Sequence, residues 1–97
     1  MPGKQRAYLR SLANSLDTIL TVGKGGLSEN VIKQAEEALT ARELIKGRVL
    51  EASMLTAGEA CQALAEATGA EPIQSIGSRF VLYRAHPTEP KIQLPKA

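Results

Sequence analysis

A glycine-rich segment at residues 22–29 constrains the fold of this chain most. Its sequence, VGKGGLSE, follows a β-branched run and leads into a pattern typical of an amphipathic helix. Glycine allows close approach to an anion and a positive φ, and a helix N-terminus offers unpaired N–H donors at the positive end of a dipole. Lys24 adds a cation at the tip. The segment therefore predicts a strand, a tight turn suited to a phosphate, and a helix.

The spacing of the glycines narrows the kind of ligand. Gly23 and Gly26 form Gly-x-x-Gly, and neither the nucleoside triphosphate loop nor the Gly-x-Gly-x-x-Gly dinucleotide fingerprint occurs in the chain. This disfavours a nucleotide-cofactor enzyme and favours a backbone clamp on nucleic acid, as in the Gly-x-x-Gly loop of KH modules. The alternative is that Gly25 and Gly26 only make a tight turn between strand and helix.

Length and composition predict one globular domain over residues 1–97. The hydrophobic content is 43% and the charged content 23%, and no apolar run is long enough for a membrane span. The basic start lacks the apolar stretch of a signal peptide. A single cysteine and a single histidine can supply neither an internal disulfide nor a Cys/His zinc site. We therefore expect a cytoplasmic protein without cofactor, metal or membrane contact.

The charges are segregated along the chain, although the net charge is only +2. Residues 1–48 hold eight Lys or Arg against five acids, residues 49–70 hold three glutamates and no base, and residues 71–97 hold four bases against two acids. Such a chain can present one basic face to a polyanion. The alternative is that the surplus lysines and arginines are ordinary solvated surface.

The first half of the chain predicts two helices and two strands. Apolar residues at helical spacing mark a helix over Lys4–Leu16, with Arg6 and Arg10 on its outer face. Thr18–Val22 is a β-branched strand, and Ser28 is a good N-cap for a second helix. In a strand over Leu44–Leu50, alternation places Ile45 and Val49 on one face and Lys46 and Arg48 on the other. The first helix has Tyr8, Leu9, Leu12 and Leu16 on its apolar side.

The second half predicts a helix and a hairpin. Thr56 and Glu59 have capping-box spacing, and Gly69 ends the helix. Cys61 lies in the apolar stripe of that helix, which indicates a small buried hydrophobe and not a catalytic thiolate. Strands over residues 73–76 and 80–84 join through Gly77-Ser78, and Arg79, Val81 and Tyr83 share one face. Residues 85–97, with three prolines, form an extended segment in which His86 has no evident catalytic partner.

These elements predict an α/β protein of the two-layer α+β sandwich type. Two right-handed crossovers make the first three strands parallel, and the hairpin makes the fourth antiparallel. The result is a four-stranded mixed sheet with helices, preceded by an N-terminal helix. With three aromatic residues in the chain, base stacking on an exposed aromatic platform is poorly supported, and we expect Tyr8 and Tyr83 to pack in the core or at its edge.

Short segments spread over nearly the whole sequence carry a family resemblance. They are Gln5 and Leu9, Leu12-Ala13, the 22–28 segment, Ala38-Leu39, Glu43-Leu44-Ile45-Lys46, Thr68-Gly69-Ala70, Ile76-Gly77, Val81-Leu82-Tyr83-Arg84 and Ile92-Gln93-Leu94-Pro95. In these segments the chain resembles the CRM (chloroplast RNA splicing and ribosome maturation) domain, and specifically the bacterial single-domain YhbY-type proteins. Gly47 is a departure, because relatives generally carry a β-branched or bulkier residue there.

The resemblance implies a fold like the C-terminal domain of translation initiation factor 3. It also implies RNA binding through the Gly-x-x-Gly loop and association with precursors of the large ribosomal subunit. We therefore expect a non-catalytic, monomeric protein that binds ribosomal RNA. An enzyme acting on a phosphorylated small molecule and a protein-only assembly adaptor remain as alternatives. The candidate RNA-binding residues are Gly23, Lys24, Gly25, Gly26, Lys46, Arg48, Arg6, Arg10, Lys33 and Arg79.

Overall fold

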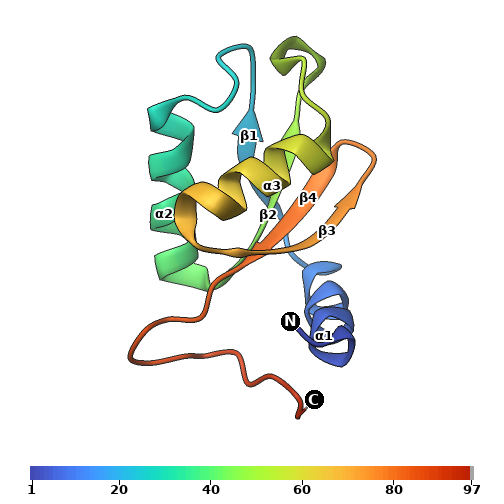
Figure 1. Cartoon of the computed structure of the whole chain (residues 1–97), viewed down its shortest axis with the longest axis vertical. Coiled ribbons are helices and arrows are strands. Elements are labelled where there is room, and N and C mark those ends of the chain that lie inside the picture. Colours follow the sequence, from blue (N-terminus) through green and yellow to red (C-terminus); the bar gives the residue numbers. More distant parts are fainter. Residues whose placement is uncertain (97) are drawn as a thin grey trace.

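The computed structural model describes residues 1–96 and shows the predicted α/β architecture, with three α-helices and a four-stranded mixed sheet (Figure 1). The bounds of the predicted elements shift by only a few residues. The elements are α1 (Gly3–Ala13), β1 (Thr18–Val22), α2 (Glu29–Arg42), β2 (Leu44–Val49), the 3-10 turn η1 (Glu51–Ser53), α3 (Ala57–Thr68), β3 (Glu71–Ile76) and β4 (Arg79–Tyr83).

The strands lie in the order β1-β2-β4-β3. β1 is parallel to β2, and β4 is antiparallel to both β2 and β3, so β1, β2 and β3 run in one direction as predicted. The hairpin strand β4 fills the position between β2 and β3. Because β1, β2 and β3 run in the same direction, the segments that follow them lie at the same end of the strands. These segments are the 23–28 loop, η1 and the 77–78 turn, and we call this side of the sheet the loop edge (Figure 1).

The two faces of the sheet bury separate apolar clusters. α2 and α3 cover one face and enclose a cluster that includes Leu20, Leu39, Leu64 and Phe80. On the other face α1 packs over the end away from the loop edge, where Leu9 contributes to a second cluster (Figure 1). The part of that face between α1 and the loop edge includes the exposed residues Arg48 and Arg79, and we call it the open face. The second cluster also contains Ala13, Leu44, Ile73, Val81 and Tyr83.

Local signals in the sequence set the helix and turn ends. The Ser28 hydroxyl accepts a hydrogen bond from the Val31 N–H at 3.3 Å, and Thr56 forms a reciprocal capping box with Glu59. Gly69 and Gly77 adopt φ values of 73° and 59°, the left-handed region that favours glycine. The predicted caps and the predicted hairpin turn are therefore confirmed.

The N-terminal helix departs from its prediction in three ways. It ends at Ala13 and not at Leu16, because Asn14 begins a turn. Arg6 is not on an outer face: its guanidinium donates a hydrogen bond to the Pro72 carbonyl of β3. Tyr8 is 39% exposed and lies outside both clusters, whereas Tyr83 is buried as predicted. The apolar periodicity located the helix but did not reveal which part of the sheet it would cover.

Gly47 is explained by its partner across the sheet. Gly47 on β2 pairs with Phe80 on β4, and the phenyl ring covers the glycine. A Cβ on Gly47 would lie 2.8 Å from Phe80 Cε2, closer than real Cβ contacts allow. The Phe80 ring therefore occupies the space that a side chain at residue 47 would need.

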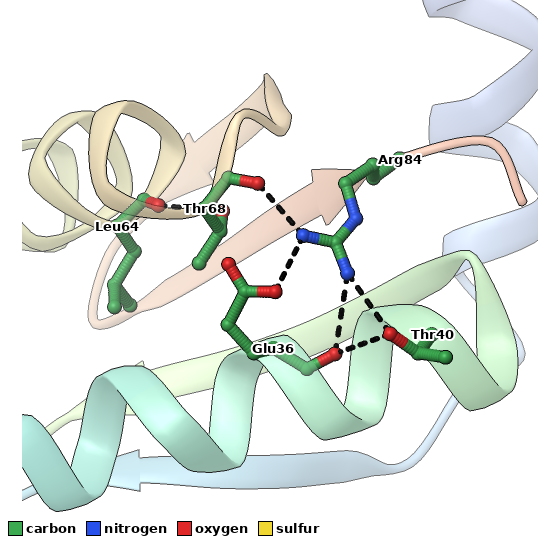
Figure 2. Close-up of polar contacts among 5 residues, drawn as sticks. All are labelled: Glu36, Thr40, Leu64, Thr68 and Arg84. Carbon is green, nitrogen blue, oxygen red and sulfur yellow. Dashed lines mark hydrogen bonds and ion pairs between the residues drawn. The ribbon is translucent and has the colours of Figure 1, made fainter. Parts of the chain in front are cut away.

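Arg84 links the two helices that cover the sheet (Figure 2). Its Nη1 donates to Glu36 Oε2 on α2 at 2.8 Å and to the Thr68 carbonyl of α3 at 2.7 Å. Its Nη2 donates to the Glu36 carbonyl and to Thr40 Oγ1. The arginine of Val-Leu-Tyr-Arg therefore has a structural role, since it satisfies carbonyl and carboxylate groups where α2 and α3 meet.

Glu43 holds the C-terminal segment against the domain. The residue is 1% exposed, and its carboxylate accepts hydrogen bonds from the backbone N–H groups of His86, Lys91 and Ile92. Ile92 and Leu94 then pack on the second cluster. The predicted extended segment therefore lies along the domain through residue 96, and residue 97 falls outside the described part.

Candidate nucleic-acid interface

The Gly-x-x-Gly loop is a tight turn at the loop edge. The Gly26 N–H donates to the Gly23 carbonyl at 2.9 Å, and Gly26 has a φ of 63°. Gly25 is exposed, lies outside the left-handed region, and has open space where a Cβ would project. The backbone conformation therefore favours glycine at residue 26, whereas nothing in the fold requires a glycine at residue 25.

Backbone donors are available at the tip of this loop. The N–H groups of Lys24 and Gly25 have no hydrogen-bond partner within residues 1–96. The N-terminus of α2 is less suited to bind an anion, because the Ser28 hydroxyl already accepts the Val31 N–H and Glu29 places a carboxylate in the first turn. We therefore expect an anion to bind the loop amides and Lys24 in preference to the helix N-terminus.

Backbone pairing joins the loop to the end of β2. The Leu50 N–H donates to the Val22 carbonyl at 2.9 Å, and Thr21 pairs with Arg48 in the parallel register. A Cβ on Gly23 would lie 3.7 Å from Leu50 Cδ1. Arg48 therefore lies on β2, directly beside β1, the strand that leads into the loop.

Three predicted cations share the open face. Ile45 and Val49 pack under the helices, so alternation along β2 directs Lys46 and Arg48 to the opposite face, as predicted. Arg79 is the direct cross-strand partner of Arg48 and shares its face with buried Val81. Within residues 1–96, the two ion pairs are Met1 with Glu71 and Arg84 with Glu36. Lys46, Arg48 and Arg79 thus form no ion pair within the described chain.

The other predicted cations lie apart from this group. Arg6 is half-buried against β3, whereas Arg10 is exposed on α1. Lys33 is exposed on α2, which covers the opposite face of the sheet, and it has Glu29 and Glu37 one helical turn away on either side. The structure therefore brings Lys24, Lys46, Arg48 and Arg79 toward the loop edge and open face, but not Arg6, Arg10 and Lys33.

A hollow on the open face contains two residues that the sequence interpretation did not single out. Asn14, at the end of α1, and Gln74, on β3, line a cavity of about 200 Å³ together with Lys46 and Arg79. Neither side-chain amide has a hydrogen-bond partner within residues 1–96. Ala13, Ile76 and Val81 complete the lining. No local signal marks this hollow in the sequence, because α1 and β3 meet only in the fold.

Cys61 and His86 are the residues that could suggest catalysis, but both have structural roles. Cys61 is 2% exposed, as predicted, and burial raises the pKa of its thiol, which disfavours a thiolate. The His86 Nδ1 accepts hydrogen bonds from the N–H groups of Thr88 and Glu89 and so stabilises a turn.

Within the described part of the chain, no helix has the length and apolar character needed to cross a membrane.

Sequence comparisons show which known proteins this chain resembles. The model of the CRS1/YhbY (CRM) domain family matches residues 1–84. The chain is 42% identical over 95 residues to "Probable RNA-binding protein YqeI" of Bacillus subtilis, covering 98% of this chain and 99% of the relative. It is 40% identical over 93 residues to a Haemophilus influenzae protein named "RNA-binding protein", covering 96% and 93%.

A solved structure shows the same fold. The solution structure of a hypothetical protein from Staphylococcus aureus is 43% identical in sequence and has a TM-score of 0.78. The similarity covers 98% of this chain and 99% of that one. The fold, the Gly-x-x-Gly loop in its predicted place and these matches lead to one conclusion: the chain belongs to the CRS1/YhbY (CRM) domain family.

Proposed function

We propose that this protein binds structured RNA through its Gly-x-x-Gly loop and the cations of the open face. The contacts are made to phosphates by the Lys24 and Gly25 amides and by the side chains of Lys24, Lys46, Arg48 and Arg79. Phosphate contacts of this kind provide affinity and orientation rather than sequence specificity. Arg10 and Lys33 add long-range attraction from outside the contact surface, and Arg6 acts mainly in the fold.

One observation carries this proposal. Arg48 and Arg79 are direct cross-strand partners on an exposed surface next to the loop, and no carboxylate within residues 1–96 pairs with either of them. Like charges in this position destabilise a sheet, so the fold itself gains nothing from them. A polyanion that lies across the loop edge would neutralise both arginines.

We further propose that the RNA is ribosomal, in precursors of the large subunit, and that the protein acts in the cytoplasm as a monomer. The resemblance to YhbY-type proteins supports this choice, and the names of the relatives support RNA as the partner. No catalytic step is assigned, because Cys61 and His86 serve the core and a turn.

The experiment is a mobility shift with fragments of large-subunit ribosomal RNA at several salt concentrations. Phosphate contacts release counterions, so affinity should fall steeply with salt, and Lys24→Ala or Arg48→Ala should each reduce the log–log slope by about 1. A thermal-shift screen with nucleotides tests the alternative of an enzyme for phosphorylated ligands. Binding partners that survive nuclease treatment would instead favour the protein-only adaptor.

A further inference from the structure

The hollow beside Lys46 and Arg79 has the chemistry of a base pocket. Ile76, which is 66% exposed, supplies apolar surface in its lining above buried Val81 and Ala13. The unpaired amides of Asn14 and Gln74 each offer a donor and an acceptor. Asparagine and glutamine use this pair of groups to bind the edge of a nucleobase. Lys46 and Arg79 add two cations to the same lining.

Size and charge limit what the hollow can hold. Its volume of about 200 Å³ lies below the ~300–1,000 Å³ of typical small-molecule sites, which disfavours a whole nucleotide cofactor. Two other surface hollows are of similar volume, but their linings include the carboxylates of Asp17 and Glu51, respectively. The hollow at Gln74 has no acidic residue in its lining, so it alone of the three suits a group attached to a polyanion.

We propose that this hollow receives one unpaired nucleobase from an RNA helix bound across the open face. The apolar lining contacts the face of the base, Asn14 and Gln74 bind its edge, and Lys46 and Arg79 contact the adjacent phosphates. RNA is read in this way at bulges and loops, where bases are already unstacked. This inference rests on the proposed function and adds to it the preferred substrate, a helix that carries a bulged nucleotide.

The test compares two RNA duplexes that differ by a single bulged nucleotide, each titrated with wild-type protein and with Gln74→Leu. Leucine keeps the approximate size of the side chain but removes both hydrogen-bonding groups. We expect wild type to bind the bulged duplex about tenfold more tightly, within the usual range for a bidentate base contact. Gln74→Leu should lose this preference and retain the affinity and salt slope of wild type on the paired duplex.

Two further measurements keep the test decisive. Gln34→Leu is the matched control, because Gln34 is exposed on α2, and it should retain the preference. If Gln74→Leu does not fold, Asn14→Ala at the exposed end of α1 replaces it and should also lose the preference. Equal wild-type affinity for both duplexes, or a preference that survives in the pocket variant, would overturn the base pocket alone. Failure of wild type to bind either duplex would overturn the proposed function as well.

Discussion

Arg48 on β2 and Arg79 on β4 lie directly opposite each other in the sheet, both exposed, and neither forms an ion pair within residues 1–96. Like charges in directly opposed positions repel each other. The two arginines therefore do not stabilise the fold, whereas both can contribute to binding a polyanion.

Removing one of these charges should stabilise the protein and weaken RNA binding. For Arg48→Gln we expect a gain of about 0.5 kcal/mol in the free energy of unfolding, because cross-strand repulsion is relieved. The log–log salt slope of RNA binding should fall by about 1. Urea unfolding and salt titrations measure the two effects, with exposed Lys96→Gln as the control. Unchanged RNA affinity and slope in Arg48→Gln would remove this residue from the interface.

The loop glycines should respond differently to substitution. Gly25→Ala should bind and fold normally, because its Cβ meets open space. Gly25→Asp should keep the fold and lose at least about tenfold in RNA affinity, since a carboxylate then repels the phosphate. Gly26→Ala should instead destabilise the protein by about 1 kcal/mol because residue 26 has a positive φ. Circular dichroism, thermal unfolding and a mobility shift distinguish these outcomes, and wild-type affinity in Gly25→Asp would contradict the clamp.

Glu43 should make the stability of the protein depend on acidity. Burial alone would raise the pKa of this carboxyl, but hydrogen bonds from the His86, Lys91 and Ile92 N–H groups lower it below its ordinary value. The folded-state pKa is therefore below that of the unfolded chain. The stabilisation is present at neutral pH and is lost as the pH falls below about 4 toward the lowered pKa.

We expect the free energy of unfolding to decrease over this acidic range in wild type and to change less in Glu43→Gln. At neutral pH that variant should already be less stable by about 2 kcal/mol, because a neutral amide is a weaker acceptor for three backbone donors and adds an N–H₂ group to a buried site. Urea unfolding at a series of pH values provides the comparison. An identical pH dependence in the two proteins would show that Glu43 does not control it.

Gly47 and Phe80 should behave as a coupled pair. Gly47→Val should cost about 2 kcal/mol of stability, because its Cβ would enter the space of the Phe80 ring. Phe80→Leu, which shortens the buried side chain, should reduce that cost when the two changes are combined. A double-mutant cycle by urea unfolding measures the coupling. Additive effects of the two substitutions would contradict the close contact.

The sequence by itself determined the local elements of this protein. Alternation along residues 44–50 separated Ile45 and Val49 from Lys46 and Arg48, and Ser28, Thr56 and Gly69 marked helix ends through capping chemistry that depends only on neighbouring residues. The Gly-x-x-Gly turn was likewise predictable, because a strand, its glycines and a helix follow one another directly. The family resemblance added the assignment as a CRM domain.

Only the tertiary structure decided which distant residues meet. The position of β4 between β2 and β3 places Arg79 opposite Arg48 and Phe80 over Gly47, whereas a hairpin prediction does not specify the next neighbour in the sheet. The docking of α1 turned Arg6 toward Pro72 and brought Asn14 beside Gln74. Helical periodicity and strand alternation act over a few residues, but packing between elements depends on how the whole chain buries its apolar faces.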